Sequence, residues 1–347
     1  MNRWTLGLAG LLLLASAAPA AAKETPQWPV RNPLILKPTE PSLKQRTISG
    51  FYGPRLKWGA NRYDHHEGWD FYAFYDPAHK DGHHPVHSIL SGKVVDIIDP
   101  PNPERVETGR KVVIGHKMKW SAFGAPSSWG HVFTGYLHLH QIGVKKGQSV
   151  EGGDVVGTAG ATGYTKTVHL HFNCYRHDGK RYVNVNPGRI FKKKVGRFLL
   201  PLDKRTARAK VLHRDKDKKR LVLRVLVVWN CQTFDGMILD FGKEKRGFSF
   251  ELISDKLRDK RDRGDKDLFD RMQLYPLKFN GGESVHELNT PRRVPSSWPA
   301  RQFPVKTVGP WQGWDLVVSE VPEGVDSVKL TLLGCNGEKL KTKLKFD

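Results

Sequence analysis

The sequence has 347 residues and a globular composition, with 38% hydrophobic and 27% charged residues. Its 57 Lys and Arg residues outnumber its 35 Asp and Glu residues, and the formal net charge of +22 predicts affinity for polyanions rather than a particular fold. Beyond the N-terminal segment no stretch is long and apolar enough to span a bilayer, so we expect no membrane span after that segment is removed.

The N-terminal segment, residues 1–22, has the pattern of a signal peptide. Arg3 precedes an apolar run from Leu6 to Leu14, and mostly small residues follow as far as Ala22. We expect cleavage after Ala20 or Ala22, and an uncleaved anchor is the alternative. The mature protein is therefore predicted to be exported, either periplasmic or secreted. In that compartment an anionic envelope polymer is a better polyanionic partner than nucleic acid, for which no recognition helix or aromatic-basic motif is found.

Residues 23–45 are predicted to form an extended arm, because five prolines disfavour regular structure there. From residue 46 to residue 196 the chain alternates short β-branched runs with glycines, and no long amphipathic helix is evident. The predicted strands are 86–98 with a turn at Ser91-Gly92, 111–116, 132–139, 155–156, 168–175 and 182–185. This pattern predicts a mainly antiparallel β domain whose loops carry the functional groups.

A basic stretch over residues 197–220 is predicted to be a linker between domains, and its charge could attach the protein to anionic envelope polymers. Residues 221–347 are predicted to form a smaller β-sandwich-like domain, which could be immunoglobulin-like, with strands at 221–229, 247–253, 314–321 and 328–333. Three cysteines permit one disulfide; we predict a Cys231–Cys335 pair and a buried, inert Cys174 thiol.

Two histidines on one predicted strand indicate a metal site. In Thr167-Val168-His169-Leu170-His171-Phe172, alternation places His169 and His171 on the same face. Upstream, His66-Glu67-Gly68-Trp69-Asp70 offers a further imidazole and a carboxylate. We expect Gly68 to let the backbone turn so that His66 and Asp70 converge. Together these side chains supply enough nitrogen and oxygen ligands for zinc, although each motif alone occurs often by chance.

Further motifs follow in a fixed order: Ser49-Gly50-Phe51-Tyr52-Gly53-Pro54-Arg55, Pro85-Val86-His87, Gly92-Lys93-Val94, Tyr136-Leu137-His138-Leu139 and Gly157-Thr158-Ala159-Gly160-Ala161-Thr162-Gly163. With the two metal motifs they make the region from Ile48 to Pro187 resemble the lysostaphin/LytM-type zinc metalloendopeptidases, which have the duplicated hybrid motif fold and cut peptide bonds in bacterial peptidoglycan. His140 forms a second His-x-His pair with His138, and Tyr136 favours the register that selects His138.

The resemblance implies that His66, Asp70 and His171 bind Zn²⁺ and that His138 and His169 are catalytic residues beside the metal. It implies an exported zinc metalloendopeptidase that hydrolyses peptide cross-links of peptidoglycan. The alternative is a non-catalytic protein on the same fold that binds the wall or activates other wall hydrolases. For His83, His84 and His87, which lie in or near an expanded loop, we expect surface positions rather than a second metal site.

Overall fold

The structure is a computed structural model, and it describes residues 24–31, 48–50, 52–57, 62–72, 78–177, 182–191, 202, 204, 207–217, 219–228, 234–242, 244–254, 274–276, 278–279, 282–283, 311–318, 320–335 and 337–346. The predicted signal peptide, much of the predicted arm and Cys231 lie outside these residues. The domain boundaries therefore stay predictions. The predicted Cys231–Cys335 disulfide is wrong, because Cys335 has a buried thiol whose pKa burial raises well above its usual value.

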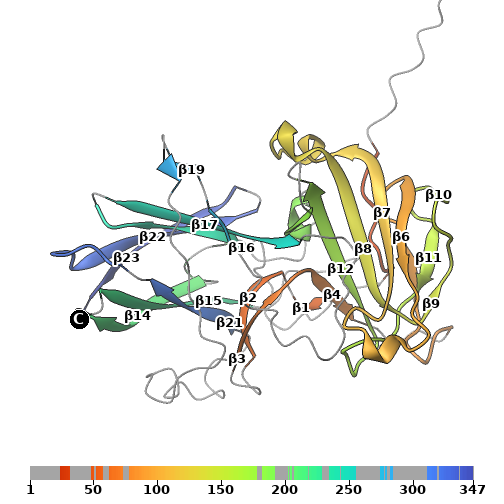
Figure 1. Cartoon of the computed structure of the whole chain (residues 1–347), viewed down its shortest axis with the longest axis horizontal. Helices are drawn as coiled ribbons and strands as arrows, with labels where there is room; N and C mark the ends of the chain where they lie inside the picture. Colours follow the sequence, from red (N-terminus) through yellow and green to blue (C-terminus); the bar gives the residue numbers. More distant parts are fainter. Residues whose placement is uncertain are drawn as a thin grey trace, which may run out of the picture.

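The described chain is mainly antiparallel β structure, as predicted (Figure 1). The strands of the first half are β1 Ile48–Gly50, β2 Gly53–Lys57, β3 Arg62–His66, β4 Trp69–Tyr72, β5 Pro85–His87, β6 Gly92–Ile98, β7 Arg110–Lys119, β8 His131–Leu139, β9 Gln141–Ile142, β10 Ser149–Val150, β11 Val155–Thr158, β12 His169–His177 and β13 Tyr182–Val185. Those of the second half are β14 Ala207–Asp215, β15 Arg220–Val228, β16 Phe234–Asp240, β17 Lys245–Ser254, β18 Leu274–Pro276, β19 Lys278–Phe279, β20 Gly282–Glu283, β21 Trp311–Val318, β22 Ser327–Gly334 and β23 Lys339–Lys345.

The helical segments in the described part are short 3-10 turns: η2 Pro103–Arg105, η3 Trp120–Phe123, η4 Ser127–Trp129 and η5 Pro187–Arg189. Among the described residues no helix has the length and apolar character needed to cross a membrane.

The largest sheet has the strand order β10-β6-β7-β8-β12-β13-β17-β16-β22-β23, and β4 pairs with β12 while β1 pairs with β4. Smaller sheets are formed by β5-β11-β9, β14-β15-β21, β2-β3 and β19-β20. In Figure 1 the sheet that contains β16, β17, β22 and β23 lies over the sheet of β14, β15 and β21, so the second half of the chain has the two layers expected of a β-sandwich.

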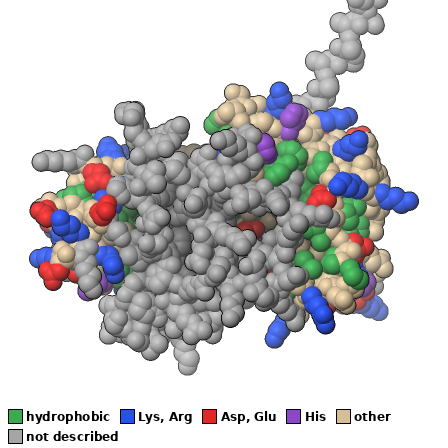
Figure 2. Space-filling view, viewed as in Figure 1, with side chains coloured by type: hydrophobic (Ala, Val, Ile, Leu, Met, Phe, Trp, Pro, Cys, Tyr) green, Lys and Arg blue, Asp and Glu red, His purple; other side chains and the backbone are tan. Residues whose placement is uncertain are grey.

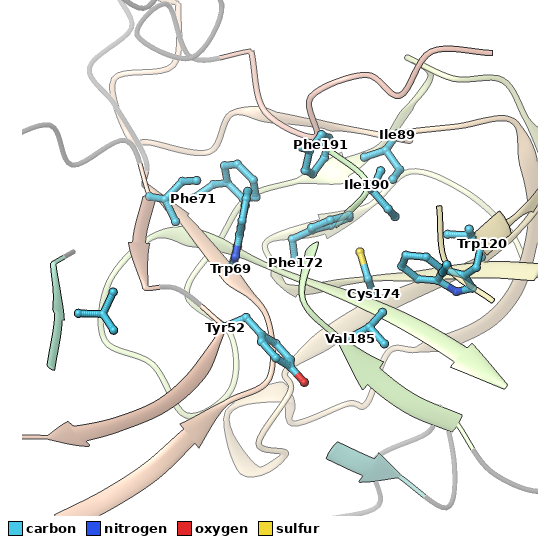
Figure 3. Packing of buried hydrophobic residues seen from close by; sticks show 14 of the residues in the cluster. Tyr52, Trp69, Phe71, Ile89, Trp120, Phe172, Cys174, Val185, Ile190 and Phe191 are labelled. Carbon is cyan, nitrogen blue, oxygen red and sulfur yellow. The ribbon is translucent and has the colours of Figure 1, made fainter. Parts of the chain in front are cut away.

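Aromatic side chains fill the core behind the strands that carry the predicted site (Figure 3). Trp69 and Phe71 alternate with Asp70 on β4, and both are buried. The ring of Trp69 stacks on Phe191, and Phe71 meets Phe172 edge to face. Because neighbouring side chains of a strand point to opposite faces, this packing fixes which residues of β4 and β12 face the site.

Residues 24–31 have no regular secondary structure, as predicted, yet they pack tightly against the first half of the fold. The buried ring of Trp28 stacks on Phe191 with centroids 4.4 Å apart. The backbone N–H of Ser91 donates to Glu24, and the N–H of His87 donates to the Pro29 carbonyl. The described part of the predicted arm is therefore an integral segment of the core.

The second half of the chain continues the same sheet. Strand β13 pairs with β17 through Tyr182↔Ser254, Val183↔Ile253 and Asn184↔Leu252. The side chains of Arg189 and Asp235 form an ion pair across the same boundary. Part of the predicted linker is also a strand, since Ala207–Asp215 pairs along its length with β15. The sequence did not predict this strand, because its composition is basic. Charged side chains can nevertheless occupy the solvent face of a strand.

Candidate metal centre

Strands β4 and β12 bring the predicted ligands together. In their antiparallel register Asp70 lies opposite His171, and Tyr72 lies opposite His169. The strand alternation that we predicted for His169 and His171 is present, with Leu170 and Phe172 in the core on the other side. His66 enters from β3, four residues before Asp70. Side chains about a hundred residues apart in the sequence therefore meet in one place.

The three predicted ligands present their donor atoms to one another. His66 Nε2 lies 3.1 Å from His171 Nδ1 and 3.1 Å from Asp70 Oδ2, and His171 Nδ1 lies 2.8 Å from Asp70 Oδ1. Among the described residues this is the one group of His, Cys, Asp or Glu side chains found with metal-binding spacing.

This donor set fits a zinc ion. Ligands about 2.0–2.1 Å from zinc in a tetrahedron are about 3.4 Å apart, close to the observed separations. His66 and Asp70 side chains are only 6% and 16% exposed. Burial alone would raise the pKa of Asp70, but the nearby His66 and His171 outweigh it and hold that pKa well below its usual value. The Asp70 carboxyl group is therefore ionised at neutral pH, as a zinc ligand would have to be.

His138 lies beside the ligands, as the register with Tyr136 predicted. Its ring centroid is 5.0 Å from that of His169 and 5.7 Å from that of His171. His138 has a backbone φ of 60°, which interrupts the alternation of β8. The alternative, His140, is exposed and stacks instead on His83, with centroids 3.9 Å apart.

Backbone carbonyls fix the tautomers of His138 and His169. His138 Nδ1 lies 2.7 Å from the Thr162 carbonyl oxygen, and His169 Nδ1 lies 2.8 Å from that of Thr167. A carbonyl only accepts, so each Nδ1 carries the proton and each neutral ring keeps an accepting Nε2. Burial, followed by the neighbouring His171 and His169, lowers the pKa of His138 to about 3. His169 Nε2 is 3.6 Å from Asp70 Oδ1.

Two glycines leave room for this arrangement. A Cβ on Gly68 would lie 2.2 Å from Asn173 Oδ1 and 2.3 Å from the Phe172 carbonyl oxygen. Glycine is thus required because β12 approaches the backbone closely, and not because of the sharp turn predicted from the sequence. A Cβ on Gly50, where β1 pairs with β4, would lie 2.3 Å from Asp70 Oδ2, so a larger residue at this position would displace the Asp70 carboxylate.

Sequence reasoning missed Tyr72 and Thr162. Tyr72 lies on the same face of β4 as Asp70 and is 38% exposed. The alternation of side chains along a strand, applied two residues beyond Asp70, would have placed Tyr72 at the site. Thr162 was visible only as part of a glycine-rich run. Its hydroxyl donates to the Leu139 carbonyl and accepts from the Arg110 N–H, which holds the Thr162 carbonyl near His138.

The expected surface positions of the other histidines are wrong in two cases. His84 and His87 are 2% and 6% exposed, because the segment before β5 folds inward. His87 Nδ1 lies 2.8 Å from the Gly153 carbonyl oxygen, and burial lowers the pKa of His87. His83 is partly exposed, with its Nδ1 2.9 Å from the Ala159 carbonyl oxygen.

Comparison with protein families agrees with this geometry. Residues 64–187, which include the three predicted ligands and both predicted catalytic histidines, match the profile of peptidase family M23. The match covers 124 of the 347 residues of this chain. The predicted resemblance is thereby confirmed.

Curated relatives are similar to part of this chain. Peptidoglycan DD-endopeptidase ShyB of Vibrio cholerae is 35% identical over 135 residues, which are 39% of this chain and 26% of ShyB. Lysostaphin of Staphylococcus simulans is 32% identical over 94 residues, 25% of this chain and 15% of lysostaphin. The matching region therefore spans about a quarter or less of the length of these relatives.

Among solved structures, a zinc-containing peptidase from Vibrio cholerae is 31% identical, with 42% of this chain and 37% of that chain covered at a TM-score of 0.29. The lysostaphin catalytic domain is 24% identical, with 43% of this chain and 95% of that chain covered at a TM-score of 0.30.

Proposed function

We propose that this protein is an exported zinc metalloendopeptidase that hydrolyses peptide cross-links of bacterial peptidoglycan. His66, Asp70 and His171 are the proposed zinc ligands, and His138 and His169 are the proposed catalytic residues. The observation that carries the proposal is the convergence of His66 Nε2, His171 Nδ1 and the Asp70 carboxylate inside an M23 domain. The names of ShyB and lysostaphin support a cell-wall substrate.

Zinc in this place supplies Lewis-acid chemistry for amide hydrolysis. The reaction also needs one group that takes a proton from the attacking water and one that delivers a proton to the leaving amine. His138 and His169 suit both steps, since each has Nδ1–H donated to a carbonyl and Nε2 left to accept. The low pKa of His138 keeps its ring neutral at pH 7, so its Nε2 is free of a proton in that state.

Mass spectrometry of peptides released from isolated sacculi tests the proposal. The wild-type protein should release cleaved muropeptides, a chelator should stop the release, and added Zn²⁺ should restore it. Asp70→Ala should lose both zinc and activity. Asp154→Ala is the matched control, because its carboxylate accepts from the Glu151 N–H on the surface. Bound zinc without any wall hydrolysis would favour the non-catalytic alternative.

Export and attachment to anionic envelope polymers complete the proposal. The net charge of +22 supports a polyanionic partner at the site of action. Fractionation of cells that express the full chain should place the protein outside the cytoplasm; retention in the cytoplasm would contradict this part.

A further inference from the structure

A row of lysines lies on the outer face of strand β23. The strand reads Lys339-Leu340-Lys341-Thr342-Lys343-Leu344-Lys345, and its four lysines are exposed while the residues between them are partly or fully buried. Leu340 and Leu344 pack against the core. The period of two therefore sets all four ammonium groups on one side, with about 6.7 Å between successive lysines along the strand.

Strand β22 adds a fifth charge to this face. Lys329 is exposed and lies directly opposite Lys343 in the β22–β23 register. Neither strand contains an acidic residue. No ion pair within the described residues involves any of the five lysines, whereas Lys219 and Lys146 elsewhere are paired with Glu323 and Asp96. We call Lys329, Lys339, Lys341, Lys343 and Lys345 the lysine ladder.

The ladder is self-repulsive. Like charges directly opposite each other in an antiparallel pair destabilise the pairing, and lysines two residues apart repel in the same way. A charged edge strand also discourages pairing with another chain, and β23 is the last strand in the sheet order. However, edge protection alone does not require the charge at Lys329, which lies on the inner neighbour β22.

The ladder differs from the general positive charge of the surface. Lys and Arg side chains are spread over the described surface at both ends of the molecule and alternate with acidic groups in Figure 2. Asp240 of β16 lies opposite Lys329 in the β16–β22 register, so the acid-free row consists of the four lysines of β23. An evenly spaced row of this kind offers repeated contacts to one chain of charges. A flexible linear polymer can meet such a row along its length, whereas a compact anion would contact one or two lysines.

We propose that the lysine ladder binds a linear polymer that carries one phosphate in each repeat unit. This proposal rests on the proposed function only in naming the cell wall as the place where such a polymer is met. Each lysine that neutralises a phosphate releases a condensed counterion, so the affinity falls steeply with salt. Binding therefore attaches the second half of the chain to the wall without any contact at the metal centre.

The experiment measures binding of the full chain to soluble poly(glycerol phosphate), which contains no peptide bond to cleave. Fluorescence anisotropy of the labelled polymer gives the dissociation constant between low and physiological salt. The logarithm of the association constant falls linearly with the logarithm of the salt concentration, and each contact to a single-stranded polyelectrolyte contributes about 0.7 to the steepness of this fall. The variant Lys341→Gln/Lys343→Gln should therefore make the slope less steep by about 1.4. Lys341→Arg/Lys343→Arg should keep the wild-type slope.

Lys117→Gln/Lys119→Gln is the matched control. Both residues are exposed at alternate positions of β7, and their replacement removes the same net charge. Its slope should equal that of the wild type. Equal slopes for the wild type and the ladder variant, or an equal loss in the control, would overturn the proposal. Binding to vesicles with phosphatidylglycerol but not to the polymer would also overturn it. Peptide release from sacculi, measured separately, reports on the proposed hydrolysis alone.

Discussion

The pairing of β1 beside the metal centre makes Gly50 a sensitive position. A Cβ there would lie 2.3 Å from Asp70 Oδ2 and 3.0 Å from His66 Cε1. Since ordinary contacts of a carbon atom lie near 3.5 Å, the Gly50→Ala change requires the carboxylate to move by about 1.2 Å. Asp70 Oδ2 is now 3.1 Å from His66 Nε2, so such a shift separates the two proposed ligands.

We expect Gly50→Ala to weaken zinc binding by about 10- to 100-fold, the range found when the support of a metal ligand is lost. A misplacement of about 1 Å also lowers turnover by about 100-fold. Zinc affinity is measured by competition with a chromogenic chelator, and turnover by muropeptide release from sacculi.

Gly143→Ala is the control, because its new Cβ would meet no atom closer than 3.5 Å. It should keep the zinc affinity of the wild type. If Gly50→Ala binds zinc as tightly as Gly143→Ala while both remain folded, the carboxylate is not confined by β1 and the reasoning fails.

Three further predictions concern the division of roles, acid stability and the N-terminal segment. His171→Ala should lose zinc, whereas His169→Ala should keep zinc, measured by mass spectrometry of the metal content, and lose turnover; the reverse pattern would overturn the assignment. Burial lowers the pKa of His116 to about 4, below its unfolded value of about 6.5, so the unfolded chain binds more protons and stability is lost as the pH falls from about 6.5 to 4. Urea unfolding of His116→Gln should show a shallower loss over this window, and an unchanged profile would count against His116. Trp28→Ala should lower the free energy of unfolding by about 3–5 kcal/mol, because the buried ring on Phe191 is lost. A loss below about 1 kcal/mol in urea unfolding would show that residues 24–31 are dispensable.

The sequence predicted the strands of the first half well, because β-branched runs between glycines are a direct sign of buried strands. Tyr182–Val185 has the predicted bounds, and the run from Val132 to Leu139 differs from β8 by one residue. Strand β23 was not predicted, because it is rich in lysine and has few of the β-branched residues by which strands were recognised. Its alternation of lysine with other residues nevertheless has the period of two that is typical of a strand.

The predicted ligands meet because alternation on a strand is a local rule that sequence alone can apply. Other features depend on distant neighbours. The close approach of Asn173 to Gly68, the inward position of His84 and the packing of Trp28 on Phe191 arise from contacts that no local pattern encodes. The free and buried Cys174 agrees with its apolar surroundings, and burial raises the pKa of its thiol well above the usual value.

The unbroken sheet from β12 through β13, β17, β16 and β22 to β23 determines how the two halves of the chain can move. Hydrogen-bonded strands are about 4.8 Å apart, so the strand that carries His171 and the strand that carries the lysine ladder are separated by about 24 Å along the sheet. Two domains on a flexible linker would search a volume set by linker length. Here the sheet acts as a rigid spacer. If β23 held a wall polymer, the sheet would keep the proposed cleavage site at a fixed distance from the point of attachment.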